Sequence, residues 1–138
     1  MSGQTQKVTL TWSEAMRFEG RTSGGAVTSL DGEGSLSPSP TQLLLESLGG
    51  CAGIDVVEIL RKGRQGLEGV AVEVEGTRRK ETPRRFTRIV LRFVIRGDVD
   101  RSAAERAVDL SLERYCSVFH TLRKDLAVET EVVLESGG

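Results

Sequence analysis

The feature that most constrains the fold is a change in the hydrophobic period along the chain. Up to residue 30 apolar and polar residues alternate, as in half-buried strands, whereas after Ser39 the apolar residues recur at helical spacing. Farther along, the apolar residues alternate again over residues 70–96, recur at helical spacing up to residue 122, and alternate once more in the last segment. The expected strands cover residues 8–12, 16–21, 26–30, 70–76, 86–96 and 128–134, and the expected helices cover residues 40–65 and 102–122. The order β-β-β-α-β-β-α-β, with strands in antiparallel runs, predicts an α+β fold and not a doubly wound sheet.

Both expected helices begin with residues typical of a helix N-terminus. Ser39 is a good N-cap, Pro40 suits the first helical position, and Gln42 completes the spacing of a capping box. The same spacing recurs at Ser102 and Glu105. Because the first helix is apolar over most of its length, we expect it to be largely buried.

The composition is lean for a chain that folds alone. A length of 138 residues suits one domain spanning residues 1–138, but only 38% of the residues are hydrophobic, 4% are aromatic, and 16 are glycine. This shortage of apolar surface favours a core that a second subunit completes. The formal net charge of 19 − 20 = −1 argues against a nucleic-acid partner, because phosphate binding needs a basic excess.

The sequence contains no candidate membrane helix. The most apolar segment, residues 43–60, is interrupted by the carboxylates Glu46, Asp55 and Glu58. The first ten residues lack the basic and apolar regions of a secretory signal. We therefore expect a cytoplasmic protein without a membrane partner.

Cys51 and Cys116 are the two cysteines of the chain, one on each expected helix. Two are too few for a disulfide-built scaffold, and neither belongs to a CxxC pair of the kind found in zinc ribbons and thioredoxins. Both lie on apolar helix faces, so they are either inert core residues or a pair that meets where the helices pack. Gly49, Gly50 and Gly53 lie beside Cys51, and we expect them to let the second helix come as close as a disulfide requires.

A polar residue follows each cysteine by one helical turn. We expect Asp55, four residues after Cys51, to accept a hydrogen bond from a buried donor or a cationic partner. His120, four residues after Cys116, would suit a nucleophile–base pair or half a metal site, although a lone histidine is more often simply packed. The chain has no second histidine and no third cysteine, so we expect no metal centre and no cofactor.

A cysteine that attacks as a thiolate needs a nearby cation. Arg17, with Arg21 as the second choice, is the candidate from the expected first hairpin. The basic cluster within residues 78–85 belongs to the turn of the second hairpin, where we expect a solvated tip.

The segment from Pro40 to Cys51 resembles the first cysteine helix of the OsmC/Ohr family, the osmotically inducible and organic hydroperoxide resistance proteins. In that family a proline stands eleven residues before the cysteine, as Pro40 does here. The segments Gly50-Cys-Ala-Gly-Ile-Asp-Val-Val and Tyr115-Cys-Ser-Val are similar to one OsmC-like branch. The similarity runs from the first hairpin to the last strand, and the two cysteines, 116 − 51 = 65 residues apart, are its most specific part.

The resemblance implies an intertwined homodimer with two long central helices covered by antiparallel sheet. It also implies a thiol-dependent peroxidase that reduces organic or hydrogen peroxides in defence against oxidative stress. Cys51 would be the peroxidatic thiolate and Cys116 the resolving cysteine, with an external dithiol as the reductant. One position departs from the family: the hydroperoxide-resistance branch has a glutamate directly after the proline, paired with a hairpin arginine, whereas this chain has Thr41, followed by Gln42.

Two other interpretations stay open. The missing glutamate favours a protein of the same fold that binds a small hydrophobic ligand in the thiol pocket or senses redox state. The apolar helix faces and the lack of any other catalytic signature favour a structural module with inert cysteines.

Overall fold

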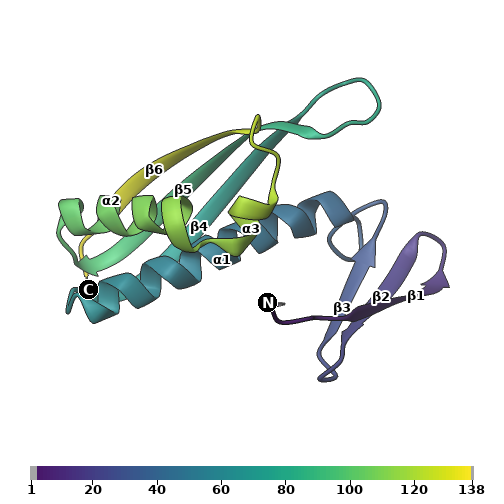
Figure 1. The fold of residues 1–138 in the computed structure, drawn as a ribbon, viewed down its shortest axis with the longest axis horizontal. Helices are drawn as coiled ribbons and strands as arrows, with labels where there is room; N and C mark the ends of the chain where they lie inside the picture. Colours follow the sequence, from purple (N-terminus) through teal and green to yellow (C-terminus); the bar gives the residue numbers. More distant parts are fainter. Residues whose placement is uncertain (1–2, 138) are drawn as a thin grey trace. The chain divides into compact units, whose positions relative to one another are not determined.

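The computed structural model describes residues 3–137 and has the expected α+β fold (Figure 1). Its strands are β1 (Val8–Glu14), β2 (Arg17–Thr22), β3 (Val27–Asp31), β4 (Gly66–Arg78), β5 (Phe86–Asp98) and β6 (Ala127–Glu135). Its helical segments are α1 (Pro40–Lys62), α2 (Arg101–Leu110), the π-helical turn η1 (Ser111–Tyr115) and α3 (Ser117–Thr121). The chain divides between Leu44 and Leu45 into two compact units, here called the N-terminal and the C-terminal unit.

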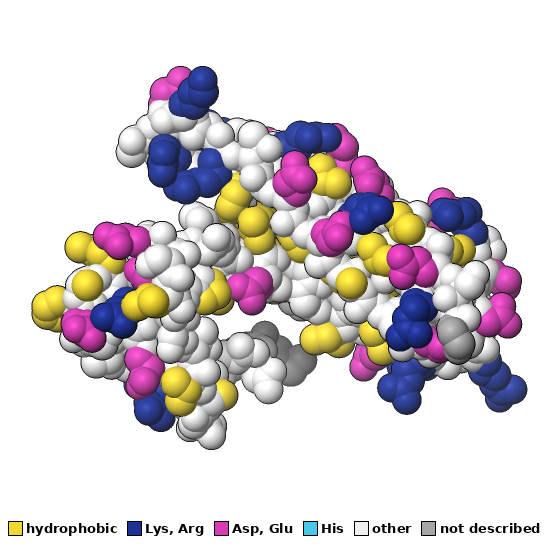
Figure 2. Space-filling model, turned by 180° about the vertical axis from the view of Figure 1, so that it is seen from behind, with side chains coloured by type: hydrophobic (Ala, Val, Ile, Leu, Met, Phe, Trp, Pro, Cys, Tyr) yellow, Lys and Arg dark blue, Asp and Glu magenta, His cyan; other side chains and the backbone are white. Residues whose placement is uncertain are grey.

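The N-terminal unit contains a small antiparallel sheet with the order β1-β2-β3. Its register places Leu10 opposite Gly20 and Trp12 opposite Phe18, so that apolar side chains gather on one face. β1 is exposed at all seven residues, although its alternation predicts a half-buried strand. Figure 2 shows apolar side chains on the surface of this unit, and the core cluster of the described residues draws its members from residue 45 onward. The sheet therefore has an apolar face but no core of its own.

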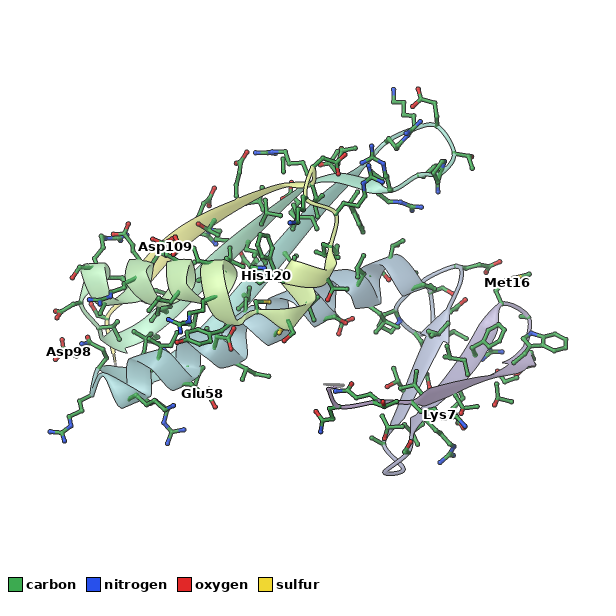
Figure 3. All side chains as sticks on the ribbon, viewed as in Figure 1. Lys7, Met16, Glu58, Asp98, Asp109 and His120 are labelled. Atoms are coloured by element: carbon green, nitrogen blue, oxygen red, sulfur yellow. The ribbon has the colours of Figure 1, made fainter. Side chains whose placement is uncertain are left out.

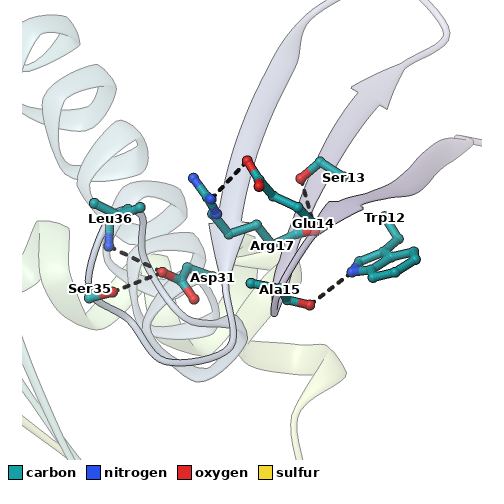
Figure 4. Close-up of polar contacts among 8 residues, drawn as sticks. All are labelled: Trp12, Ser13, Glu14, Ala15, Arg17, Asp31, Ser35 and Leu36. Atoms are coloured by element: carbon teal, nitrogen blue, oxygen red, sulfur yellow. Dashed lines mark hydrogen bonds and ion pairs between the residues drawn. The ribbon is translucent and has the colours of Figure 1, made fainter.

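Asp31 closes β3 and organises the loop that leads to α1 (Figure 4). Its buried carboxylate accepts hydrogen bonds from the backbone N–H of Glu33 at 2.9 Å, the hydroxyl of Ser35 at 3.1 Å and the backbone N–H of Leu36 at 3.2 Å. These donors, with the Glu33 N–H foremost, hold the pKa of Asp31 below its ordinary value. The turn-rich loop is thus built around an ionised carboxylate.

The C-terminal unit contains a sheet with the order β4-β5-β6. β4 and β5 are antiparallel, but β5 and β6 run parallel, so the expectation of antiparallel runs is wrong for the last strand. After β5 the chain passes through α2, η1 and α3 before it enters β6. A helical crossover of this kind is what a parallel pair requires.

The two faces of the β4-β5-β6 sheet differ in chemistry. On one face, arginines of β5 form ion pairs with glutamates of β4 and β6. The pairs are Arg88–Glu129 at 2.9 Å, Arg92–Glu73 at 2.7 Å and Arg96–Glu68 at 3.2 Å. Figure 2 shows basic and acidic side chains beside one another over this unit. The other face forms the core with one side of α1 and of α2, and it is most deeply buried along β5. The buried residues of β5 are Ile89, Leu91, Phe93 and Ile95.

α1 begins with the capping box expected from the sequence. The side-chain oxygen of Gln42 accepts the backbone N–H of Ser39 at 2.9 Å, and the Ser39 hydroxyl accepts the backbone N–H of Gln42 at 3.3 Å. The helix continues without a break to Lys62, three residues before the expected end at residue 65. None of the helices within residues 3–137 is long and apolar enough to cross a membrane.

The glycines around Cys51 bring α1 close to the sheet, and not close to the second helix as expected. A Cβ atom added at Gly49 would lie 2.6 Å from Cγ2 of Val74, and one added at Gly53 would lie 3.2 Å from Cγ2 of Val72. At Gly50 nothing lies within 4 Å. Two of the three glycines are therefore needed because β4 packs directly on the backbone of α1.

The second expected helix is broken, which corrects the expectation of two long helices. Its regular part, α2, ends at Leu110, and the π-helical turn η1 carries the chain to Cys116, where the backbone is extended. The capping box expected at Ser102 is also wrong: the N-cap of α2 is Asp100, two residues before Ser102, and Asp100 makes no side-chain cap hydrogen bond. A capping-box spacing alone did not locate this helix start.

Candidate functional site

The two cysteines lie beside each other in the C-terminal unit, and both are free thiols. Cys51 is carried by the middle of α1 and is half-buried, whereas Cys116 is fully buried between η1 and α3. The Cys51 side chain lies close enough to Cys116 to help raise the pKa of the Cys116 thiol. Of the two interpretations of the cysteines, the fold thus favours a pair over two unrelated core residues.

The break in the second helix gives Cys116 an unusual backbone position. Its N–H donates to the carbonyl of Ser111 at 2.7 Å, five residues earlier, and its φ and ψ of −74° and 99° then leave the helix. The Cys116 sulfur accepts the backbone N–H of Phe119 at 3.5 Å and so caps α3. The position of the thiol is therefore set by these two local hydrogen bonds, because Cys116 does not lie on a continuous helix.

The surroundings of Cys116 keep it protonated. Burial is the largest cause and raises the pKa of the Cys116 thiol to about 11, and the neighbouring Cys51 and the charge of Asp55 act in the same direction. The N–H of Phe119 opposes them by favouring the thiolate. The half-exposed Cys51 is therefore the better candidate for meeting a substrate first.

Asp55 and Ser111 link α1 to η1 next to the thiols. The Ser111 hydroxyl donates to Oδ2 of Asp55 at 2.8 Å, and Ser111 is fully buried. The prediction that Asp55 accepts a hydrogen bond from a buried donor is confirmed. Sequence reasoning did not assign a role to Ser111; the signal that marks it is a hydroxyl on an otherwise apolar helix face.

The arginine candidates lie in the other unit. Arg17 pairs with Glu14 at 2.9 Å (Figure 4), and Arg21 pairs with Glu19 at 3.0 Å. Because both arginines belong to the N-terminal unit and both cysteines to the C-terminal unit, the contact of Arg17 with the Cys51 thiolate stays a prediction.

Thr41, at the position where the hydroperoxide-resistance branch is expected to carry a glutamate, is polar but uncharged. The hydroxyl of Thr41 lies 3.3 Å from the hydroxyl of Ser39, so it takes part in the start of α1. Because a threonine hydroxyl is uncharged, Thr41 cannot supply the negative charge of that branch's glutamate.

The other residues considered from the sequence, His120 and the basic hairpin tip, make other contacts. His120, labelled in Figure 3, is exposed on α3 and meets the ring of Phe119 edge-on, with 5.3 Å between the centroids. Most of the basic hairpin tip is exposed, as expected, and the Nε of Arg78 there donates to the carbonyl of Arg84 at 2.6 Å. Within residues 3–137, no three side chains of His, Cys, Asp or Glu are grouped so that they could hold a metal ion.

Comparison with known proteins identifies the family and the fold of this chain. Residues 32–131 match the family model described as OsmC-like protein. Protein YhfA of Escherichia coli K12 is 45% identical over 115 residues, which cover 82% of this chain and 86% of YhfA. The crystal structure of a hypothetical protein from Aquifex aeolicus VF5 superposes with a TM-score of 0.90 at 30% identity, covering 99% of this chain and 100% of the other.

A more distant structure shares the fold. It is an organic hydroperoxide resistance protein OsmC from Legionella pneumophila, 18% identical with a TM-score of 0.72, and the match covers 96% of this chain and 99% of the other. The family model and the relatives together show that this chain belongs to the OsmC-like proteins of the OsmC/Ohr family.

Proposed function

We propose that this protein is a cysteine-based peroxidase that reduces organic or hydrogen peroxides. The observation that carries the proposal is a pair of adjacent free thiols with unequal burial, Cys51 half-exposed and Cys116 enclosed. Family membership supports it, since structures of the same fold are named organic hydroperoxide resistance proteins.

The chemistry divides into three steps. The Cys51 thiolate attacks one peroxide oxygen and becomes a sulfenic acid, while the O–O bond breaks and the leaving alkoxide or hydroxide takes up a proton. The Cys116 sulfur then attacks the Cys51 sulfur, forming a disulfide and releasing water. An external dithiol reduces the disulfide through a mixed disulfide and is itself oxidised.

The unequal burial of the two thiols supports different roles for them in these steps. At pH 7 a thiol with a pKa of about 11 is ionised in about one molecule in 10⁴, so Cys116 competes poorly for peroxide. Its position beside Cys51 suits it to the second step, where the sulfenic acid is delivered to it. We therefore assign Cys51 as the peroxidatic and Cys116 as the resolving cysteine.

Arg17 is our candidate for the cation that stabilises the Cys51 thiolate. In the family's hydroperoxide-resistance branch a glutamate beside the proline orients the arginine, and Thr41 cannot do so here. The carboxylate that contacts Arg17 in this structure is that of Glu14, at 2.9 Å. A half-exposed pair of this kind adds little stability, but it restricts the direction of the guanidinium.

We propose that the active form is a homodimer. The apolar face of the N-terminal sheet leaves Val8 63%, Leu10 52% and Trp12 63% exposed. Contiguous apolar surface of this kind usually marks an interaction site. A second copy that covers this face would supply the apolar surface that the lean composition lacks. A dilution series by light scattering should show a dimer, and a stable folded monomer would contradict this part of the proposal.

We place the reaction in the cytoplasm, where reduced thiols persist. The reductant is a small dithiol or a dithiol protein, because the disulfide must be opened after each turnover. The proposal includes no nucleic-acid partner and no membrane partner.

Mass spectrometry before and after cumene hydroperoxide tests the function directly. We expect the loss of two hydrogen atoms per chain and a peptide that contains the Cys51–Cys116 disulfide. If both thiols remain titratable in excess peroxide, the peroxidase proposal fails. Disulfide formation without turnover in the presence of a dithiol would instead favour a redox sensor of the same fold.

A further inference from the structure

Ser111 makes two hydrogen bonds that connect the elements carrying the two thiols. Its hydroxyl donates to Asp55 on α1 at 2.8 Å, one turn beyond Cys51. Its carbonyl accepts the N–H of Cys116 at 2.7 Å. One buried serine therefore joins the helix of the first cysteine to the backbone of the second.

The position of Cys116 depends on the π-helical turn η1, which begins at Ser111. An α-helix closes each turn over four residues, but the Ser111 carbonyl is bonded five residues on, to Cys116, after which the chain leaves the helix. Wide turns of this type are rare and are often found at functional sites. The place of the Cys116 sulfur therefore depends on η1 keeping this form.

Asp55 also acts on Cys116 through its charge. Its carboxylate disfavours the Cys116 thiolate, as do burial and the neighbouring Cys51 thiol. The residue that anchors Ser111 thus also helps to keep the second thiol protonated while Cys51 is still reduced.

We propose that Asp55 and Ser111 are a pair of positioning residues that hold η1 so that Cys116 faces Cys51, and that they set the rate of disulfide closure. Neither residue takes part in the bond changes at Cys51, so we expect the first oxidation of Cys51 not to depend on them. The inference rests on the proposed function only for the identity of the oxidant, because closure of the thiol pair can be followed without peroxide.

One equivalent of 4,4′-dithiodipyridine separates the two steps. The Cys51 thiolate attacks one sulfur of the reagent, forms a mixed disulfide and releases the first thiopyridone. Cys116 then attacks the Cys51 sulfur, loses its proton to solvent, forms the protein disulfide and releases the second thiopyridone. The first release measures access to Cys51, and the second measures closure.

Ser111→Ala should slow the second release by about tenfold or more, since a hydrogen bond to a charged group is lost. The first release should stay within about twofold of wild type, and Ser111→Thr, which keeps the hydroxyl, should restore closure. Ser117→Ala, the same change one residue after Cys116, is the matched control and should leave both rates unaltered.

Asp55→Asn tests the charge of Asp55 separately from the hydrogen bond that Asp55 accepts from Ser111. It keeps an acceptor oxygen for Ser111, so closure should be slowed less than in Ser111→Ala. Because the charge that raises the Cys116 pKa is gone, the pH profile of the second release should move to lower pH. Among the described residues, the other titratable group that acts on Cys116 is the Cys51 thiol, which is consumed in the first step.

If Ser111→Ala closes as fast as wild type, or if both releases slow together, the pair does not position Cys116 and the proposal is wrong. If Ser111→Ala does not fold, the double variant Ser111→Ala/Asp55→Leu replaces both partners by apolar groups and should fold while still closing slowly. Closure that depends on Ser111 in a protein inert to peroxide would overturn the peroxidase proposal and leave this one standing.

Discussion

The two segments that carry the cysteines use opposite backbone solutions. α1 is a continuous helix of 23 residues that presents Cys51 half-buried, whereas the second segment is broken into α2, η1 and α3 and encloses Cys116. A continuous helix fixes a side chain by the packing of the whole element. A broken helix fixes it by local hydrogen bonds, here those made by the Cys116 N–H and by its sulfur. In the proposed mechanism the half-buried thiol on the continuous helix takes the first chemical step, and the enclosed thiol beyond the broken helix takes the second.

Replacing each cysteine in turn by serine should give the largest difference in peroxide turnover between the two sites. Cys51→Ser should abolish peroxide turnover, because the remaining thiol, Cys116, is buried and protonated. Cys116→Ser should still react once with peroxide and accumulate a sulfenic acid at Cys51, which dimedone traps and mass spectrometry locates. Equal turnover in the two serine variants would contradict the division of roles.

The pH dependence of alkylation should separate the two thiols in the wild-type protein. Iodoacetamide reacts with thiolates, and a pKa of about 11 leaves Cys116 about 100-fold less ionised at pH 8 than a cysteine of pKa about 9. The initial labelling rate at Cys116 should therefore keep rising with pH until about pH 11. Site-resolved mass spectrometry measures it, and a labelling rate at Cys116 that levels off near pH 8 would show that the site is not desolvated.

The close approach of α1 to β4 can be tested with one substitution at two adjacent positions. In Gly49→Ala the new methyl would lie 2.6 Å from Val74, and we expect a loss of about 1–3 kcal/mol in the free energy of unfolding. Gly50→Ala is the control, because nothing lies within 4 Å of its added Cβ and alanine favours a helix by about 1 kcal/mol. Chemical denaturation of both variants decides the matter, and equal effects would mean that β4 does not restrict α1.

The starts of the two helical segments should differ by a smaller amount. Ser39→Ala removes an observed cap from α1 and should cost about 1 kcal/mol of unfolding free energy. Ser102→Ala should change it by about 0.5 kcal/mol or less, since Ser102 lies inside α2 and does not cap it. Urea denaturation of the pair measures the difference, and a similar loss in both would restore the capping box that the sequence suggests for the second helix.

Much of the fold followed from local sequence patterns. The alternating segments predicted the six strands to within a few residues, and Ser39, Pro40 and Gln42 located the start of α1 because a capping box acts within one helical turn. The same reasoning failed at Cys116, where the apolar spacing of residues 104–122 is equally compatible with an unbroken helix. Hydrophobic spacing records which side faces the core, but it does not record a single widened turn.

The glycines show a similar limit. Three glycines in five residues correctly indicated a close approach to the backbone of α1, but the partner is β4 and not the second helix. A glycine has no side chain to indicate which element approaches it, so the partner depends on the topology.

The sequence by itself therefore determined the family, the order of the elements, and the two cysteines as the candidate site, because these depend on residue types and short spacings. Only the tertiary structure decided the parallel pairing of β6, the break before Cys116 and the bond from Ser111 to Asp55, which joins residues 56 positions apart. The physical reason is the same in each case. Such features arise when distant segments pack together, and short spacings along the chain do not record which segments will meet.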